Sequence, residues 1–548
     1  MSIQEHRVFG PPGTGKTTYL TRQIKSIVEK YGWDSLLIAS FTKTAAAELT
    51  GRSNPEGKCI GTLHSHALRS IGYGKELAEA HVDEFNTCFP HFRLSHGAKS
   101  VNVEDIAQGA TTYQTEGDKL MYRMNLLRSR MVSYELWPEN IKAFRNAWTT
   151  FKKADKLIDY TDMVEIAYND VDCAPGSPQI AMIDEAQDLS PLMLALVRKW
   201  AEHMETLVLS GDDDQTIFTF IGSSPEVFLE GEPAEKRVLS QSYRVPAVIQ
   251  AYAEKWISRV QKREAKEYKP RDYEGEIKRM SSTLKNPEQI ILEVEKYISE
   301  GKKVMILAAC SYMLERTIQL LRQQGIMFHN PYRVSNGAWN PIKLKTSNRK
   351  KEDKQLSTLM RLMTYLRPCA EFWGRETDVW SEAELSAWID MVSSKENLKK
   401  GAKKLMTERQ SHVITAEHIL EELFLEESGF WDVWDYFTKE RALNWISENM
   451  TGAATKKAQY PLSVLRKHTY EKVYAGPKLT VGTIHSVKGG EADVVVLFPD
   501  LSLSGYQEWT KGGESKDSVI RLFYVGITRA RETVILCQPA SSMAIQWM

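Results

Sequence analysis

Short apolar runs that end in polar loops alternate with helix-forming stretches in the first part of the chain. Three of the runs have the continuous apolar character of buried strands: residues 35–40, 179–184 and 206–210. The apolar pair Val8-Phe9 closes another short run, and residues 18–29 after it have the pattern of a helix. Strands that alternate with helices and end in polar loops predict a parallel α/β sheet, with its functional site at the carboxyl ends of the strands.

The alternation returns in the second half of the chain. Further strand-like runs lie at residues 304–307, 479–483, 494–498 and 534–537. Two long segments interrupt it: residues 71–159 carry polar stretches dotted with aromatic residues, and residues 331–474 hold charge runs and an aromatic cluster. The pattern therefore predicts an α/β protein with two α/β units, each interrupted by a mainly helical insertion.

The composition sets limits on this picture. The chain has 548 residues, so about two to four domains are expected. Its 71 basic and 71 acidic side chains cancel, so any site for a polyanion must be a local patch. The six cysteines form no C-x-x-C pair, which argues against structural zinc and a disulfide framework and favours a reducing compartment.

The sequence also bears on membranes. No apolar stretch approaches the length of a membrane span. Gln4, Glu5 and His6 occupy the place where a signal peptide would need apolar residues. We therefore expect a cytoplasmic protein without a membrane partner, in a prokaryote or encoded by a phage in its host.

Residues 10–17 (GPPGTGKT) fit the phosphate-loop pattern G-x-x-x-x-G-K-[ST]. Glycines let backbone N–H groups turn toward a triphosphate, Lys16 would meet the outer phosphates, and the Thr17 hydroxyl would ligate magnesium. The helix that follows points its positive N-terminal end at the phosphates. The residues expected to contact ATP here are Gly10, Pro11, Pro12, Gly13, Thr14, Gly15, Lys16, Thr17 and Thr18.

Polar residues follow the next strands. Asp184 would hold the magnesium through water, and Glu185 would orient and deprotonate the attacking water. The neutral amide of Gln215 can sense the γ-phosphate. Asp212–Asp214 before it form either a metal cluster or loop charges with some capping, and for the last two the loop interpretation is preferred.

Two arginines are candidates for neutralising the charge that develops on the transferred phosphoryl group: Arg244 and Arg529. For each, the alternative is a salt bridge on the protein surface. We take Lys16, Asp184, Glu185, Gln215, Arg244 and Arg529 as the candidate catalytic residues, and Thr17 with Asp184 as the candidate metal ligands.

In order, the chain carries GPPGTGKTT, ASFTKTAAAEL, GTLHS, DYTDM, IDEAQD, GDDDQTIFTF, LSQSYR, TVGTIHSVKGGEADVVVLF and RLFYVGITRARE. These segments resemble the ordered motifs of superfamily 1 helicases of the UvrD/Rep/PcrA type. The resemblance spans Gly10–Glu532 and is weak in both insertions. It implies two RecA-like P-loop domains that share ATP, each with an insertion called 1B or 2B. The implied boundaries are 1–70 and 160–235 for domain 1A, 71–159 for 1B, 236–330 and 475–548 for domain 2A, and 331–474 for 2B.

The resemblance also implies roles in the second half of the ATP site. Tyr243 would stack on the adenine, and Arg244 and Arg529 would be arginine fingers. Glu491 would approach the ribose and the γ-phosphate. Gln215 would couple the γ-phosphate to DNA.

A motor that grips any DNA sequence needs aromatic faces for bases and polar groups for phosphates. The positions that resemble strand-contacting ones are Phe41, Thr42, Thr62, His64, Phe220, Thr483 and His485. The phenylalanines, together with Phe218, have an alternative role as core aromatics, and the two histidines as hydrogen-bonded loop residues.

Two functions remain open. The first is ATP-dependent translocation along single-stranded DNA with strand separation, 3′→5′ by resemblance. The second is a DNA-stimulated ATPase that clamps DNA or displaces bound proteins without separating strands. The basic runs 343–354 and 395–409 would hold a duplex in the first case and are otherwise solvated faces. The expected ligands and partners are ATP, Mg²⁺, single-stranded DNA, single-strand/duplex junctions, and replication or repair proteins, with a monomer as the expected state.

Overall fold

The computed structural model describes residues 3–41, 43–53, 55, 58–72, 76–95, 115–334, 336–342, 356–408 and 417–548. The chain forms two compact units. The first comprises Met1–Leu284, Leu307–Met313 and Gly482–Met548, and the second comprises Lys285–Ile306 and Leu314–Val481. The division into four domains at the boundaries given above stays a prediction.

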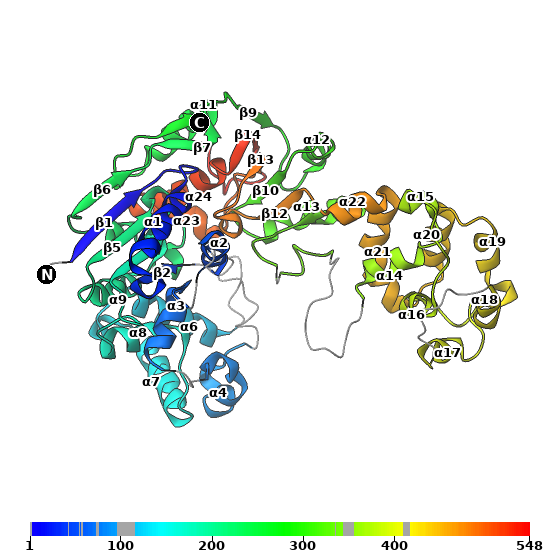
Figure 1. Cartoon of the computed structure of the whole chain (residues 1–548), viewed down its shortest axis with the longest axis horizontal. Coiled ribbons are helices and arrows are strands. Elements are labelled where there is room, and N and C mark those ends of the chain that lie inside the picture. The colour runs from blue at the N-terminus through cyan, green and yellow to red at the C-terminus, as the bar shows by residue number, and fades with distance from the viewer. Residues whose placement is uncertain are drawn as a thin grey trace. The chain divides into compact units, whose positions relative to one another are not determined.

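A parallel sheet organises the N-terminal part of the first unit (Figure 1). Its strands follow the order β3-β2-β4-β5-β1-β6, and each neighbouring pair is parallel. They are β1 (Gln4–Phe9), β2 (Leu36–Ser40), β3 (Ile60–Thr62), β4 (Ile180–Asp184), β5 (Thr206–Gly211) and β6 (Glu235–Val238). Ser40 lies beside Asp184 and Phe9 beside Gly211, so the polar loops leave the same edge of the sheet. The predicted parallel α/β sheet is confirmed.

Helices pack against this sheet and complete its hydrophobic core. They are α1 (Lys16–Tyr31), α2 (Lys43–Ser53), α3 (Leu63–Ser70), α9 (Pro191–Ala201) and α10 (Pro225–Leu229). Strands β2 and β4 are buried at every residue, as expected for parallel strands covered on both faces. Ile24 of α1 packs with Leu36, Ile38 and Met182 in one cluster. This packing holds α1 against the sheet, with its N-terminal end at the loop that follows β1.

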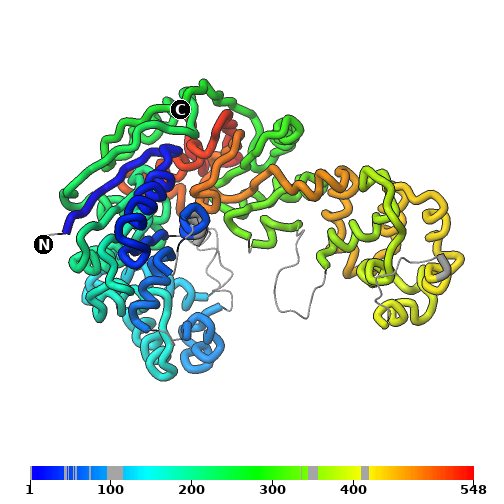
Figure 2. The backbone as a smooth tube through the Cα atoms, in the orientation of Figure 1, coloured from blue at the N-terminus to red at the C-terminus, as the bar shows by residue number. Residues whose placement is uncertain are grey.

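Figure 2 traces the chain as it leaves the sheet after α3, forms a helical segment and returns at β4. The helices of this segment are α4 (Val82–Cys88), α6 (Glu116–Ser129), α7 (Glu139–Ala154) and α8 (Tyr160–Asp170). Phe85 of α4 packs against Phe144, Trp148 and Phe151 of α7, with ring centroids 6.1, 4.9 and 5.4 Å apart. The part of residues 71–159 that the structure describes is thus helical, as predicted.

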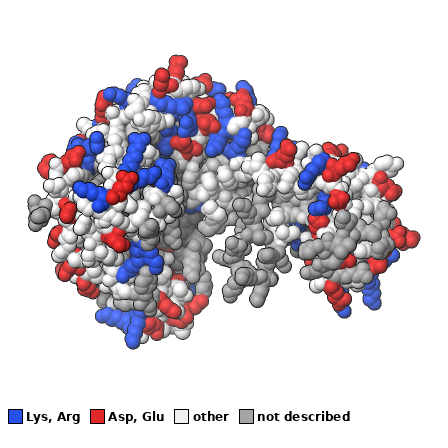
Figure 3. All heavy atoms as spheres, viewed as in Figure 1, with Lys and Arg blue, Asp and Glu red and all other residues white. Residues whose placement is uncertain are grey.

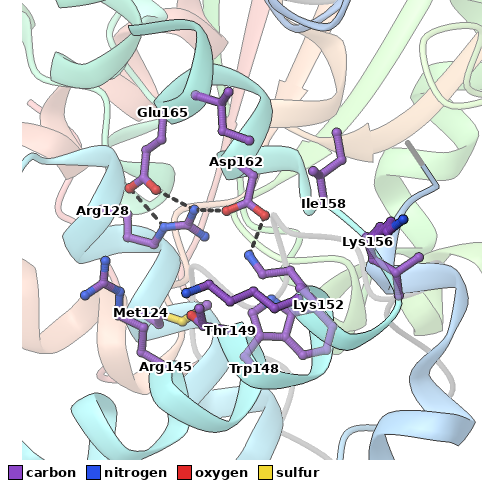
Figure 4. A pocket seen from close by; sticks show the side chains of 13 residues that line it. Met124, Arg128, Arg145, Trp148, Thr149, Lys152, Lys156, Ile158, Asp162 and Glu165 are labelled. Carbon is purple, nitrogen blue, oxygen red and sulfur yellow. Dashed lines mark hydrogen bonds and ion pairs between the residues drawn. The ribbon is translucent and has the colours of Figure 1, made fainter. Parts of the chain in front are cut away.

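A buried ion network joins α6, α7 and α8 (Figure 4). Arg128 of α6 pairs with Asp159, Asp162 and Glu165 at 3.0, 2.5 and 2.6 Å. Lys152 of α7 pairs with Asp159 at 2.6 Å and also with Asp162. The two aspartates form the capping box at the start of α8. The network ties the three helices together. A cavity of about 500 Å³ opens beside it.

The C-terminal part of the first unit adds further parallel strands. Strand β14 pairs with β13 and with β9, and β7 pairs with β8. The elements are β7 (Gln241–Pro246), α11 (Ala247–Ile257), β8 (Lys269–Arg271), β9 (Glu276–Met280), β13 (Ala492–Leu497), α23 (Leu503–Lys511), α24 (Gly513–Ile527) and β14 (Ala530–Cys537). The C-terminus lies beside α11, where the backbone N–H of Met548 donates to the Tyr252 hydroxyl at 3.2 Å (Figure 1).

The second unit is helical over most of its described length. Its helices are α12 (Glu288–Ser299), α13 (Glu315–Gln323), α14 (Thr358–Tyr365), α15 (Ala370–Trp373), α16 (Glu382–Ile389), α17 (Ala402–Glu408), α18 (Glu417–Leu423), α19 (Phe430–Asp435), α20 (Lys439–Glu448), α21 (Gly452–Lys467) and α22 (Tyr470–Ala475). Strand β11 (Phe328–His329) pairs in parallel with β12 (Leu479–Thr483), and β10 (Val304–Ala308) follows α12. Phe430, in the aromatic cluster noted in the sequence, is buried against Phe424 and Trp445 at 3.8 and 5.2 Å. Among the helices that the structure describes, none combines the length and the apolar character needed to cross a bilayer.

Candidate active site and nucleic-acid interface

The phosphate loop forms the turn between β1 and α1. Gly13 and Gly15 have φ values of 77° and 79°, in the left-handed region that glycine reaches without steric cost. A Cβ at Gly10 would lie 2.5 Å from Cγ of Lys16, so the lysine stem fills the space beside that glycine. The buried Lys16 ammonium donates to the Gly10 carbonyl at 2.6 Å. The loop therefore presents a cation and a helix N-terminus together, which suits a phosphate.

Asp184 lies at the end of β4, next to the start of α1. Its carboxylate accepts a hydrogen bond from the Thr17 hydroxyl at 3.3 Å. Burial, together with the neighbouring Glu185, raises the pKa of Asp184 to about 7. A buried carboxylate beside a second one is stabilised by a divalent cation, and carboxylate and hydroxyl oxygens are ligands that Mg²⁺ prefers. The residues present therefore fit a magnesium ion that binds with a triphosphate.

Glu185 is held in a strained and polar setting. Its φ of 53° lies in the left-handed region, which a residue with a side chain adopts at a cost. Its carboxylate accepts a hydrogen bond from Nε2 of Gln187 at 2.6 Å. Burial alone would raise the pKa of Glu185, but Lys16, Lys488 and Gln187 together bring it below its ordinary value. The carboxylate is thus kept ionised and ready to accept a hydrogen bond from water.

Arg529, at the turn into β14, faces the loop that follows β5. It is 1% exposed, so it is no surface ion-pair partner. Its guanidinium donates to the side-chain oxygen of Gln215 at 2.9 Å and to the carbonyls of Val525 and Gly490 at 3.0 and 3.2 Å. The structure thus brings two of the predicted catalytic residues into direct contact.

Strand β7 brings Tyr243 and Arg244 against the phosphate loop. The backbone N–H of Tyr243 donates to the Gly13 carbonyl at 2.8 Å, and a Cβ at Gly13 would lie 2.5 Å from the Cβ of Arg244. Arg244 pairs with Glu491 at 2.7 Å, and Arg531 pairs with the same carboxylate at 2.5 Å. The Tyr243 side chain is 69% exposed, so its ring is open to a ligand.

Asp213 and Asp214 lie in the loop that follows β5, as the preferred interpretation has it, but their charges are paired inside the protein. Both are buried, together with Asp212. Lys266 pairs with Asp212 and Asp214 at 2.9 and 3.0 Å and also with Asp213, while Arg263 pairs with Asp214 at 2.6 Å. The residue that caps this turn is Asp212, whose side chain accepts from the backbone N–H of Asp214 at 3.3 Å. The pattern around these aspartates did not point to either cation, because both lie about fifty residues further along the chain.

Lys488 and Asp188 were also missed, although both lie inside quoted motifs. The Lys488 ammonium donates to both carboxylate oxygens of Asp188 at 2.7 and 2.6 Å and to the Gln215 carbonyl at 2.6 Å. Burial raises the pKa of Asp188 to about 7 in spite of that cation. This contact gives Gln215 a second link to the C-terminal motifs besides Arg529.

Four aromatic rings from three separate motifs form one group beside Gln215. Phe41 lies 5.4 Å from Phe218, and Phe220 lies 5.9 Å from Phe218 and 5.4 Å from His485. Phe218 is buried and so has the core role left open for it, whereas Phe41 and Phe220 are partly exposed. His485 is buried, with Nε2 3.2 Å from the Ile217 carbonyl, as expected of a hydrogen-bonded histidine.

The remaining strand-contacting candidates divide by environment. The Thr62 side chain caps α3 by accepting from the Ser65 N–H at 3.3 Å, and the buried Thr483 accepts from the Ser486 N–H at 3.1 Å. The His64 ring lies 6.2 Å from that of Tyr160, and burial lowers the pKa of His64 to about 4. Thr42 lies outside the described residues.

A parallel α/β sheet with a phosphate loop, strand-end carboxylates and arginines from a later segment defines a P-loop nucleotide-hydrolysing protein. Residues 3–235 match the family model of the UvrD/REP helicase N-terminal domain, and residues 478–537 match that of the UvrD-like helicase C-terminal domain. The chain belongs to the UvrD/Rep helicase family.

Two named relatives match most of the chain, and a third matches less than half of it. A Rickettsia felis protein named a probable DNA helicase II homolog is 24% identical over 96% of this chain and 89% of its own length. DNA helicase II of Rickettsia typhi is 23% identical with the same coverage of both chains. The ATP-dependent DNA helicase UvrD2 of Mycobacterium bovis is 25% identical over 41% of this chain and 36% of its own.

Proposed function

We propose that this chain is an ATP-driven motor that moves 3′→5′ along single-stranded DNA and separates the strands of a duplex at a junction. The observation that carries the proposal is the contact of Arg529 with Gln215 beside the phosphate loop. It joins a residue of the loop after β5 to a cation from the last motif, as a shared ATP site requires. Membership of the UvrD/Rep family supports the same activity.

In this proposal, Lys16 binds the outer phosphates of ATP, and Thr17 and Asp184 hold the magnesium ion. When bound, that ion neutralises charge on the phosphates. Glu185 orients the attacking water and accepts its proton, which its lowered pKa and its bond to Gln187 allow. Tyr243 offers its exposed ring to the adenine.

Arg244 and Arg529 neutralise the charge that develops on the transferred phosphoryl group. Arg529 is buried beside Gln215, the residue expected to sense the γ-phosphate. Arg244 donates to Glu491 through Nε, so the two terminal nitrogens of its guanidinium can turn toward a phosphate. Arg531 pairs with the same carboxylate, so Glu491 keeps a cation if Arg244 moves.

The DNA strand passes over the partly exposed rings of Phe41 and Phe220. The other strand-contacting candidates belong to the same motifs or to neighbouring ones: Thr62, His64, Thr483 and His485. Stacking of a base on an aromatic ring is worth about 1–3 kcal/mol and does not depend on base identity. Lys488 contacts both the Gln215 backbone and, at 5.3 Å, the Phe218 ring. If DNA binding shifts this group of rings, the change reaches Gln215 through Lys488. This connection couples DNA binding to ATP hydrolysis.

ATP turnover and strand displacement are measured on the full chain with single-stranded DNA and with 3′- and 5′-tailed duplexes. The proposal expects hydrolysis that single-stranded DNA stimulates, displacement from the 3′-tailed duplex, and loss of both in Lys16→Ala. Stimulated hydrolysis without displacement would support instead an ATPase that clamps DNA or removes bound proteins. Preferred displacement from the 5′-tailed duplex would contradict the polarity.

Of the two basic runs noted in the sequence, 343–354 lies outside the described residues. In the other run, 395–409, the Lys404 side chain is 81% exposed.

A further inference from the structure

The side-chain amide of Gln215 lies between a donor and an acceptor. Its oxygen accepts from Arg529 at 2.9 Å, and its Nε2 donates to Asp212 at 2.8 Å. A guanidinium can only donate, and an ionised carboxylate can only accept. The two neighbours therefore allow one orientation of the amide, with its oxygen toward Arg529.

Lys266 pairs with the Asp212 carboxylate, which also accepts from the backbone N–H of Asp214. The Lys266 side chain is 1% exposed, and its ammonium lies 2.9 Å from the Asp212 carboxylate. Burial would raise the pKa of Asp212, but Lys266 and Lys16 bring it below its ordinary value, so the carboxylate stays an acceptor. The loop that carries Lys266 is fixed nearby, because the hydroxyl of Tyr268 donates to the Pro12 carbonyl at 3.0 Å.

We propose that Lys266 is a positioning residue for ATP hydrolysis, which holds Asp212 so that the Gln215 amide meets Arg529. The inference rests on the proposed function, since it assigns a role in that reaction. Lys266 itself is not a catalytic residue, because it acts through Asp212 and Gln215. Lys266 lies in the loop before β8, and Tyr268 of the same loop contacts the phosphate loop. A change in the phosphate loop therefore reaches the Gln215 amide through Lys266 and Asp212.

Arg263 provides a matched control within the same cluster. It is a second cation of this loop, and it pairs with Asp214 through two nitrogens. Replacing it with methionine removes a buried ion pair and leaves the contact between Lys266 and Asp212 in place. A purely structural role of the cluster predicts similar kinetic effects for both cations, whereas the positioning role predicts an effect of Lys266 alone.

The test compares Lys266→Met and Arg263→Met in the wild-type chain and in a Gln215→Ala background. The readouts are kcat and KM for ATP hydrolysis at saturating poly-dT. We expect Lys266→Met to lower kcat about tenfold in the wild-type background, the size of a coupling within one hydrogen-bonded network, and to change kcat less than about twofold once Gln215 is absent. KM for ATP stays within about twofold throughout, and Arg263→Met leaves kcat within about twofold.

An equal fall of kcat in both backgrounds, an unchanged kcat, or an equal effect of Arg263→Met would overturn the inference. If Lys266→Met fails to fold, the comparison is made with Asp213→Asn and Asp214→Asn present, because Arg263 then balances the charge of Asp212. The same factors are expected there, and the same results would contradict them. A wild type without DNA-stimulated hydrolysis would instead overturn the proposed function, and this inference with it.

Discussion

A lysine at position 529 would keep the positive charge but lose the guanidinium fork. The fork donates at once to Gln215, Val525 and Gly490, a geometry that a single ammonium cannot reproduce. We expect Arg529→Lys to lower kcat for ATP hydrolysis by about a hundredfold or more, since an arginine finger is worth about 10³–10⁵ in rate. KM for ATP should change far less, because an arginine finger acts mainly in the transition state. Steady-state hydrolysis at saturating single-stranded DNA measures both.

The control for this variant is another buried arginine, one that has no part in the proposed mechanism. Arg7 of β1 is 4% exposed and donates to the Leu229 carbonyl at 2.9 Å. Arg7→Lys is expected to lower thermal stability without a comparable loss of kcat. If Arg529→Lys raised KM and left kcat intact, Arg529 would be a ground-state binder of ATP.

His66 sets a pH limit on the stability of the first sheet. It is buried, with Nε2 3.0 Å from the Ile38 carbonyl, and burial together with Arg69 lowers its pKa to about 4. The unfolded chain binds this proton near pH 6.5, so the free energy of unfolding falls as the pH drops from about 6.5 toward 4. We expect the wild type to lose more melting temperature than His66→Gln between about pH 7.5 and 5.5. The exposed His203, replaced by glutamine, is the control, and equal losses in all three proteins would contradict the assignment.

At the scale of the elements, the sequence predicts the buried strands with nearly their observed bounds but does not predict the charged strands at the edges of the sheets. The stretch at residues 479–483 predicted β12 with its observed bounds, and all five of its residues are buried, as expected of a parallel strand covered on both faces. Strand β6, by contrast, carries Glu235, Lys236 and Arg237, all exposed at the edge of the first sheet. An edge strand has solvent on one side, so charge is tolerated there and the periodicity disappears.

The same difference in scale governs the site. The phosphate loop and the Asp184-Glu185 pair are local, since each needs a strand end and a few consecutive residues, and the sequence shows both. The pairing of Lys266 with Asp212 depends on how two distant segments pack. Such a contact leaves no mark in the spacing of residues, so the structure alone brings it to light.

The ion network of α6, α7 and α8 gives a stability prediction for the helical insertion. Asp159 is 1% exposed, and it also accepts from Nε1 of Trp148 at 2.9 Å. Asp159→Asn removes the more deeply buried of the two carboxylates that Arg128 and Lys152 share, the other being Asp162, and breaking a buried ion pair costs about 3–5 kcal/mol. Chemical denaturation, followed by circular dichroism, measures the loss. The exposed Asp155 is the control, and Asp155→Asn should stay within about 0.5 kcal/mol of the wild type. Equal stability of the two variants would show that the network does not hold the insertion together.

At the scale of the whole molecule, the chain has no net charge that would draw it to DNA from a distance. The 71 basic and 71 acidic side chains cancel, and Figure 3 shows both signs interspersed over the face in view. The attraction must come from local contacts of cations with phosphates and of rings with bases. Each phosphate that a cation neutralises contributes about −0.7 to the slope of log affinity against log salt for a single strand.

We therefore expect the affinity for single-stranded DNA to fall by about tenfold or more between about 50 and 200 mM salt, even though the chain has no net charge. Because stacking accepts every base, poly-dT and mixed sequences of equal length should differ by less than about threefold at one salt concentration. Fluorescence anisotropy of labelled oligonucleotides measures both quantities, and Phe220→Ala should weaken all sequences alike while leaving the salt slope unchanged. A flat salt response would mean that phosphates contribute little, and a strong preference for one sequence would mean that base edges are read in place of ring faces.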